Sequence, residues 1–166
     1  MKRINIVGLG AGDLNQLPLG IYKHLKSSQS LYLRTSEHPV VKELEQEGLS
    51  FESFDNLYEE HEQFAQVYGA IVQVLLQKSS ENDEITYAVP GHPLVAERTV
   101  QLLLEEEKRG NIAVEIIGGQ SFLDPMFSAI GLDPIDGFQL LDATSLNRDD
   151  IQLSSALIIG QVYDAY

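Results

Sequence analysis

The sequence predicts an α/β fold, an open, mainly parallel sheet with helices on both faces. Three observations predict it. Short apolar segments alternate with helical segments along most of the 166 residues, the apolar segments carry the branched side chains typical of strands buried on both faces, and glycine-bearing loops follow three of them. Ligands of such sheets bind beyond the carboxyl ends of the strands, so a cleft built from these three loops is the first candidate site.

The expected strands are short apolar runs that end at turn residues. The first stops at a group of glycines, and the run that ends at Val89 stops at Pro90. The full set of expected strands covers residues 4–9, 31–33, 85–89, 112–117, 138–141 and 156–159.

The expected helices lie between these strands and have apolar residues at three- and four-residue spacing. They cover residues 19–26, 40–47, 57–78, 94–109 and 122–130. Gly48, Gly110 and Gly131 close three of them, and Gly48 stands where a left-handed cap is commonly needed. In the 57–78 helix, His61 falls on the apolar stripe and is expected to pack.

The last part of the chain changes character. Turn residues and a polar link over residues 145–150 precede one more apolar strand, so we expect a first domain at residues 1–150 and, at residues 151–166, a linker with the first strand of a second domain. The sequence is therefore expected to be a fragment of a longer polypeptide. The apolar strand at 156–159 is expected to seek a partner edge, which predicts a homodimer.

Composition excludes several classes of function. The 11 Lys and Arg residues against 25 Asp and Glu residues give a net charge of −14, which argues against nucleic acid and membrane surfaces as partners. Cysteine is absent, so disulfides, thiolate metal sites and thiol nucleophiles are excluded. No apolar run approaches the roughly 18 residues of a membrane span, and Asp13 interrupts any signal-like segment, so a cytoplasmic location is expected.

The first loop, residues 8–13, follows a strand and is rich in glycine, as in dinucleotide sites. Its spacing argues against such a site, because Asp13 stands where the third glycine belongs and would repel a pyrophosphate. The second strand also ends at Arg34 rather than at an acid that would hold a ribose. A tight turn without a ligand is the alternative interpretation.

The second and third loops each allow two interpretations. Gly91 lets a ligand approach the backbone, and His92 is either a group that transfers protons or a polar surface residue. In the third loop, residues 118–121, Ser121 is either a ligand contact or the N-cap of the next helix.

The sequence contains no motif that supports a metal site or a catalytic triad. The run Glu59–Glu62 resembles a metal cluster by composition, but helical spacing sends its carboxylates to different sides. No HExxH or GxSxG pattern is present, so classical zinc hydrolases and serine esterases are excluded and no metal site is expected.

Taken together, residues 8–13, 87–93 and 116–122 resemble the tetrapyrrole (corrin and porphyrin) methylase family, whose signatures are GxGPGD, GDP and PG[VI]SS loops after three strands. The order and spacing agree over residues 3–132, which corresponds to the first domain of that family's fold. Residues 133–143 and 156–166 are similar to the branch that is fused to a MazG-type nucleotide pyrophosphohydrolase. That resemblance implies covalent fusion to a magnesium-dependent hydrolase domain.

The resemblance also implies a cofactor, S-adenosylmethionine, bound between two α/β domains, and a dimeric protein. Methyl transfer from a sulfonium needs little acid–base help, because the methyl group is already activated. By alignment, the cofactor-binding residues are Pro90, Gly91, His92, Ser121, Phe122 and Ala11, and the substrate-facing loop contains Gly10, Gly12 and Asp13.

Two departures from the signatures bear on activity. Ala11 replaces the proline of the first loop, and His92 replaces the aspartate of the second, which removes a carboxylate beside a cationic sulfur. The leading interpretation is an S-adenosylmethionine-dependent methyltransferase domain that acts on an unknown small-molecule acceptor and is inactive as a fragment. The alternative is a non-catalytic ligand-sensing or interaction domain of a MazG-type nucleoside triphosphate pyrophosphohydrolase.

Overall fold

The structure is a computed structural model that describes residues 2–61 and 63–163. The expectations for Glu62 and for residues 164–166 lie outside the described residues. The chain divides into two compact units, Met1–Pro125 and Met126–Tyr166, and each is described by itself.

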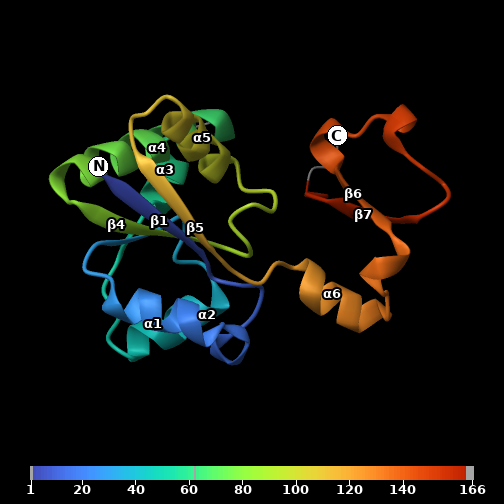
Figure 1. Ribbon diagram of the computed structural model, residues 1–166, viewed down its shortest axis with the longest axis horizontal. Coiled ribbons are helices and arrows are strands. Elements are labelled where there is room, and N and C mark those ends of the chain that lie inside the picture. The colour runs from blue at the N-terminus through green and yellow to red at the C-terminus, as the bar shows by residue number, and fades with distance from the viewer. Residues whose placement is uncertain (1, 62, 164–166) are drawn as a thin grey trace. The chain divides into compact units, whose positions relative to one another are not determined.

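The first unit contains a five-stranded parallel sheet in the order β3-β2-β4-β1-β5, which confirms the expected fold class (Figure 1). Its strands are β1 (Arg3–Gly8), β2 (Leu31–Leu33), β3 (Glu52–Ser53), β4 (Glu84–Val89) and β5 (Ala113–Gly118). The central strands β1 and β4 are buried at every position after the first, as their continuous apolar runs predict. The two-residue β3 was not expected, because it is polar and pairs only with the edge of β2.

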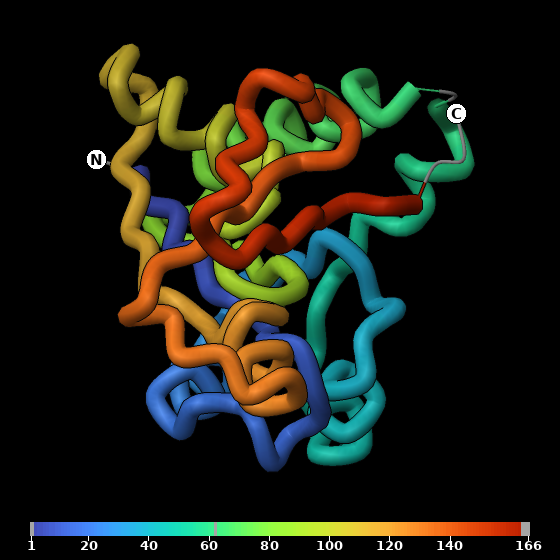
Figure 2. The backbone as a smooth tube through the Cα atoms, turned by 90° about the vertical axis from the view of Figure 1, so that its right-hand side faces the viewer, coloured from blue at the N-terminus to red at the C-terminus, as the bar shows by residue number. Residues whose placement is uncertain are grey.

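Helices cover both faces of this sheet. They are η1 (Leu14–Gln16), α1 (Leu19–Ser27), α2 (Pro39–Gln46), α3 (Asp55–Glu60), α4 (Phe64–Glu81) and α5 (Arg98–Lys108). Helices α1 and α2 lie on one face and α3, α4 and α5 on the other, and Figure 2 shows the same separation in a view turned by 90°. Each face therefore buries its own apolar core. One core includes Ile4, Ile71 and Tyr87, and the other includes Val7, Leu25 and Val41.

The expected single helix over residues 57–78 is wrong. The chain forms α3 and α4 with a break between them, where His61 and Gln63 have extended backbone angles. Acidic residues crowd the last turn of α3, next to the negative pole of that helix, and oppose its continuation. His61, expected to pack, lies half-buried at the break.

The helix expected from residue 94 begins later, at Arg98. Residues 94–97 form a turn in which Ala96 has a φ of 54°, a left-handed conformation that cannot continue an α-helix. The expected left-handed cap is confirmed at Gly48, where φ is 80°. Gly110 and Gly131, which also follow helices, have φ of 80° and 65°.

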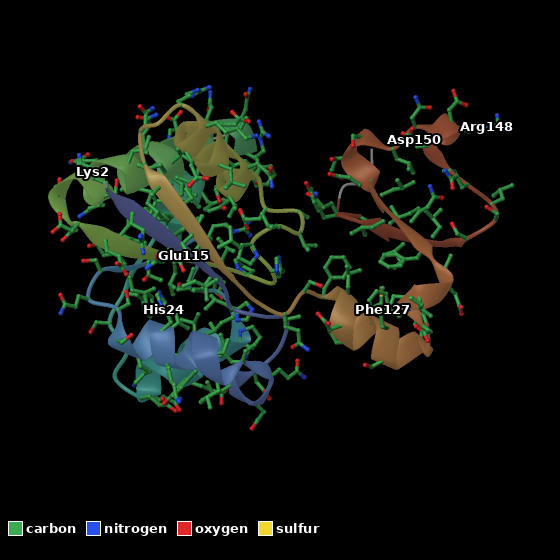
Figure 3. All side chains as sticks on the ribbon, in the orientation of Figure 1. Lys2, His24, Glu115, Phe127, Arg148 and Asp150 are labelled. Carbon is green, nitrogen blue, oxygen red and sulfur yellow. The ribbon has the colours of Figure 1, made fainter. Side chains whose placement is uncertain are left out.

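The second unit contains one pair of parallel strands, β6 (Phe138–Asp142) and β7 (Ala156–Gly160). Helix α6 (Leu123–Ile130) starts before the division and ends in this unit, followed by η2 (Pro134–Asp136), η3 (Ala143–Ser145) and η4 (Arg148–Asp150). Phe127, which is labelled in Figure 3, lies on α6. Its ring packs edge-on against that of Phe138, with ring centroids 5.3 Å apart.

The strand expected at 156–159 is therefore not without a partner, which corrects one argument for a homodimer. The expected domain boundary near Ile151 stays a prediction. The structural division falls after Pro125, and the paired strands β6 and β7 lie on either side of the expected boundary. In the described part of the chain, no helix is both long and apolar enough to cross a bilayer.

Ile71 provides a test of the core on the α3–α5 face. Its side chain is fully buried, so Ile71→Ala is expected to lower the free energy of unfolding by about 2–5 kcal/mol. Denaturant unfolding measures this loss. Leu19→Ala is the control, because Leu19 is 64% exposed and its truncation should change stability by less than about 0.5 kcal/mol. Equal losses in the two variants would contradict the assigned core.

Candidate functional site

The three glycine-bearing loops lie at the carboxyl edge of the sheet. The chain leaves β1 toward β2 and leaves β4 toward β5, in opposite directions across the sheet. Because β1 and β4 are neighbours, their loops flank the point where the strand order reverses, which is where ligands of open α/β sheets bind.

The first two loops are joined by backbone hydrogen bonds. The amide of Leu9 donates to the carbonyl of Val89 at 2.7 Å, the amide of Gly10 to the carbonyl of Gly91 at 3.2 Å, and the amide of Gly91 to the carbonyl of Gly10 at 2.9 Å. The last two bonds form an isolated antiparallel bridge beyond the parallel ladder. These three amides already donate hydrogen bonds within the protein and are therefore not free to bind a ligand.

The third loop packs directly on this bridge. A Cβ atom on Gly119 would lie 2.6 Å from the Cα of Gly8 and 2.8 Å from the carbonyl oxygen of Gly91, and a Cβ on Gly8 would lie 2.1 Å from that same oxygen. No side chain fits at either position. The expectation that the three loops share one edge is confirmed, and they do so in backbone-to-backbone contact.

Helix α2 holds the first loop in place. Nε2 of His38 donates to the carbonyl of Gly10 at 2.8 Å, while Nδ1 accepts the amide of Val40 at 3.3 Å and caps the helix. Glu43 accepts the amide of Leu14 at 3.1 Å. Burial lowers the pKa of His38, although its bond to Gly10 opposes this, so the ring is neutral in the fold.

The residues expected to face the substrate have different environments. Gly10 is buried, and Gly12 packs on Gln16, whose Oε1 would lie 2.2 Å from a Cβ on Gly12. Asp13 is exposed and accepts the amide of Asn15 at 3.0 Å as the cap of η1. Ala11, expected to contact the cofactor, is exposed beside them.

In the second loop, His92 performs the turn-capping role of a carboxylate. Its Nδ1 accepts the amide of Leu94 at 3.0 Å, and its carbonyl accepts the amide of Val95 at 3.0 Å. The turn therefore keeps a side-chain acceptor without a negative charge. Pro90 and Gly91 are partly buried, and nothing lies within 4 Å of a Cβ built on Gly91.

In the third loop, Ser121 caps α6. Its hydroxyl accepts the amide of Leu123 at 3.1 Å, and its own amide donates to Oδ2 of Asp124 at 3.1 Å, which makes a reciprocal cap. This is the second of the two interpretations that the sequence allows for Ser121. Phe122, next to it, is 38% exposed.

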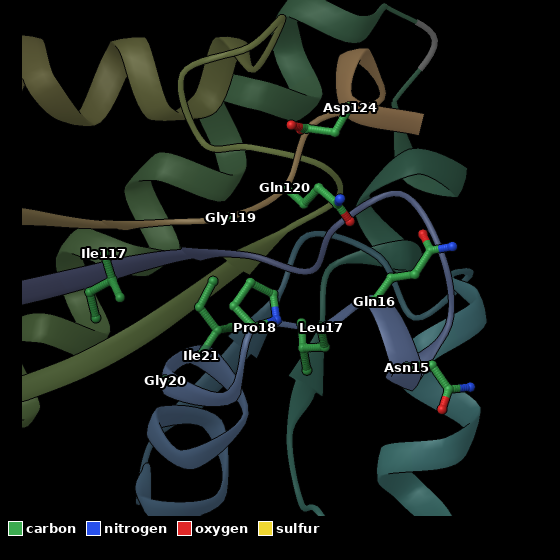
Figure 4. A pocket seen from close by; sticks show the side chains of 10 residues that line it. All are labelled: Asn15, Gln16, Leu17, Pro18, Gly20, Ile21, Ile117, Gly119, Gln120 and Asp124. Carbon is green, nitrogen blue, oxygen red and sulfur yellow. The ribbon is translucent and has the colours of Figure 1, made fainter. Parts of the chain in front are cut away.

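A cavity of about 690 Å³ lies between the start of α1 and the third loop (Figure 4). Its lining combines polar groups with an apolar wall and consists of Asn15, Gln16, Leu17, Pro18, Gly20, Ile21, Ile117, Gly119, Gln120 and Asp124. Oε1 of Gln120 is buried there without a hydrogen-bond partner among the described residues. The lining of the cavity does not include the second loop, and most of these residues were not predicted from the sequence.

Sequence reasoning also missed a buried ion pair at this edge. Nη1 of Arg34, just after β2, lies 3.1 Å from Oε2 of Glu97, just before α5. Thr99 donates its hydroxyl to Oε1 of Glu97 at 2.8 Å and is 2.9 Å from the hydroxyl of Tyr87. Burial alone would lower the pKa of Arg34, but the carboxylate of Glu97 raises it.

The segment after β2 is anchored as well. Asp55 accepts hydrogen bonds from Thr35 and from the amide and hydroxyl of Ser36, at 2.8 and 2.7 Å. Burial raises the pKa of Asp55, but these bonds outweigh it and lower the pKa to about 2. Over residues 2–61 and 63–163, no group of three or more His, Asp or Glu side chains could hold a metal ion.

This arrangement, in which glycine loops meet where the strand order reverses, is that of the open α/β domains, a class whose ligands bind at this edge of the sheet. The chain matches the family Tetrapyrrole (Corrin/Porphyrin) Methylases over residues 3–158 and belongs to that family.

A curated relative, described as Uncharacterized protein YabN of Bacillus subtilis (strain 168), is 49% identical over 162 residues. The match covers 98% of this chain but only 33% of that protein. The chain therefore spans about a third of the length of this relative.

Solved structures show the same fold at low identity. A diphthine synthase is 18% identical with a TM-score of 0.64, over 84% of this chain and 53% of that one. A uroporphyrin-III-C-methyltransferase from Thermus thermophilus is 21% identical with a TM-score of 0.66, over 95% of this chain and 67% of that one. These likenesses establish the fold alone.

Gly8 provides a test of the backbone contact. Gly8→Ala is expected to lower the free energy of unfolding by about 1–3 kcal/mol or more, because its Cβ would overlap the carbonyl of Gly91. Gly69→Ala in α4 is the matched control, since a Cβ there meets nothing within 4 Å and should stabilise the helix by about 0.5–1 kcal/mol. Thermal unfolding compares the two. A stable Gly8→Ala protein would contradict the contact.

His38 predicts a pH dependence of stability. Its pKa is lower in the folded than in the unfolded chain, so the unfolded chain binds more protons as the pH falls below about 6.5, and stability is lost. His38→Asn keeps a helix cap but loses the bond to Gly10, which costs about 1 kcal/mol at pH 8. Denaturant unfolding between pH 8 and 5 should show a smaller loss in this variant. Identical slopes would contradict the assignment.

Proposed function

We propose that this domain binds S-adenosylmethionine at the three loops and transfers its methyl group to a small-molecule acceptor. The observation that carries the proposal is the backbone cluster of Gly8, Gly91 and Gly119 at the reversal of strand order. It leaves one side of Gly91 open, so that a ligand can lie against the backbone without meeting a side chain.

The residues present fit a cationic donor. None of the three loops contains Lys or Arg, and the chain as a whole carries a net charge of −14. The buried Oε1 of Gln120 is an acceptor without a donor among the described residues, and amino groups of the cofactor are donors of the kind that it lacks.

Pro90, Gly91 and His92 are proposed to hold the cofactor through their backbone, with Ala11 and Phe122 beside them. Ser121 contributes by fixing the third loop, because its hydroxyl and amide are engaged in the cap of α6. Gly10, Gly12 and Asp13 are proposed to face the acceptor.

When bound, the cofactor supplies a methyl group already activated by a positively charged sulfur. The protein therefore needs no nucleophile or triad for this step. Its loops orient two reactants and exclude water, which is the largest contribution that a rigid backbone site makes to such a transfer. The bonds from His38 and between Gly10 and Gly91 supply that rigidity.

The length of the relative supports a larger protein. Because the chain spans about a third of it, we propose covalent fusion to a further domain, of the pyrophosphohydrolase type that the sequence resemblance implies. A homodimer remains part of this proposal.

A second candidate function is favoured by His92. The second loop keeps its turn but has no carboxylate to attract a cationic sulfur. A domain with this loop is suited to sensing a ligand for an attached hydrolase without transferring a methyl group.

Calorimetry on the full-length protein tests the proposal. S-adenosylmethionine and S-adenosylhomocysteine are both expected to bind with dissociation constants on the order of micromolar. Binding of the second ligand without turnover of the first, across a panel of acceptors, would favour the sensing function. Absence of heat from both at about 1 mM would overturn the methyltransferase function.

Gly91→Ala locates the site. Its Cβ would project into the open side where the cofactor is expected, so affinity should fall about tenfold or more. Gly110→Ala is the matched control, because Gly110 has a similar positive φ and open surroundings but precedes β5, at the opposite edge of the sheet. Both variants should lose comparable stability, and only the first should lose affinity. Equal affinities would place the ligand elsewhere.

A further inference from the structure

The fold holds the side chain of Arg34 as a cation whose one ionic partner among the described residues is Glu97. Glu97, 3.1 Å away, has a side chain only 3% exposed, whereas 26% of the Arg34 side chain is exposed. Glu97 is itself fixed by the hydroxyl of Thr99. The Arg34 side chain is therefore anchored by Glu97, and part of its surface stays accessible.

Two hydrogen-bond donors in this cluster lack acceptors. Nε of Arg34 and the hydroxyl of Tyr58 are buried, and neither has a partner among the described residues. They come from different elements, the end of β2 and helix α3, so they are independent observations. Buried donors are normally paired, because an unpaired one loses its bond to water without compensation.

The two groups belong to one electrostatic environment. Arg34 and Tyr58 each influence the pKa of the other, and burial raises the pKa of Tyr58 so that its hydroxyl keeps its proton. Both are therefore donors at neutral pH. Ala96, directly before Glu97, has a φ of 54°, a conformation that costs a non-glycine residue energy. This strained residue therefore lies directly before Glu97, the ionic partner of Arg34.

We propose that Arg34 and Tyr58 form a carboxylate-binding site at the carboxyl edge of the sheet, which holds a carboxylate of one of the two partners in methyl transfer. The proposal rests on the proposed function and adds to it the chemical group that one partner must carry.

A carboxylate fits the donors available. A guanidinium presents parallel N–H groups that match two carboxylate oxygens, and a phenol hydroxyl adds a further donor. Thr99 donates to Glu97 and so takes up part of the negative charge that would oppose a second carboxylate.

The position of Arg34 suits contact with a ligand of the second loop. Its amide donates to the carbonyl of Ala88 at 2.9 Å, two residues before Pro90, so it lies one strand from that loop.

Two sources supply this chemistry, and the experiment separates them. The carboxylate belongs either to the amino-acid part of the donor or to the acceptor. S-adenosylhomocysteine carries the first, whereas 5′-methylthioadenosine has the same adenosine and sulfur without it. Glutarate serves as a simple carboxylate probe for the second source, and its binding is measured by the shift in melting temperature of the full-length protein.

Three variants make the test. Tyr58→Phe removes only an unpaired hydroxyl and should fold as the natural protein does. The double variant Arg34→Gln with Glu97→Gln removes both charges and leaves no buried carboxylate unpaired. Arg3→Gln is the control, because Arg3 pairs with Glu115 in an ion pair whose side chains are 53% and 56% exposed, at the amino edge of the sheet.

Each outcome decides. If the carboxylate belongs to the donor, S-adenosylhomocysteine is expected to bind about tenfold or more tightly than 5′-methylthioadenosine. Tyr58→Phe and the double variant should then reduce the affinity for S-adenosylhomocysteine and leave that for 5′-methylthioadenosine unchanged. If the carboxylate belongs to the acceptor, the variants should bind both nucleosides as the natural protein does. Glutarate should then raise the melting temperature of the natural protein in a saturable way, and this shift should be absent in Tyr58→Phe and in the double variant but present in Arg3→Gln. Variants that alter neither response overturn the carboxylate site. Failure of both nucleosides to bind overturns methyl transfer, and the glutarate shift then decides the site alone.

Discussion

The first unit depends on backbone contact among Gly8, Gly91 and Gly119, which follow or end three different strands. At Gly8 and Gly119 the space for a Cβ is taken by other backbone, so the ends of β1, β4 and β5 approach more closely than side chains would permit. The bridge between Gly10 and Gly91 then locks two of the loops. A ligand that reaches this edge therefore meets peptide groups held by the sheet rather than mobile side chains.

The elements that could be predicted are those specified by local sequence. The central strands could be predicted from continuous apolar runs, and the helix ends from glycines. Both effects act within a few residues, so the local sequence is enough to recognise them. The elements that were missed depend on distant partners. β3 exists because β2 offers an edge, and α5 starts late because the turn before it places Glu97 against Arg34. Neither partner is visible in the local pattern.

The same distinction applies to the site. The three loops were predicted because parallel strands bring their carboxyl ends to one edge. His38, Arg34 and Glu97 were not, since each acts on a residue far along the chain. Signals existed for two of them: a histidine before Pro39 is placed to cap a helix, and Arg34 directly follows a strand that ends at the same edge. Glu97 had none, because an acidic residue at a helix start usually faces water.

His92 separates two roles that one carboxylate would combine. An acceptor at this position shapes the turn by taking the amide of Leu94, and the imidazole does this through Nδ1. The imidazole lacks the negative charge that would attract a cationic sulfur, so the proposed binding of such a donor has to draw on carbonyl oxygens and the acidic chain as a whole. The nearby cation at Arg34 opposes this less than a free one would, because Glu97 neutralises it. The loop geometry is therefore kept without the local charge, and the proposed affinity for the donor depends on how well the backbone fits it.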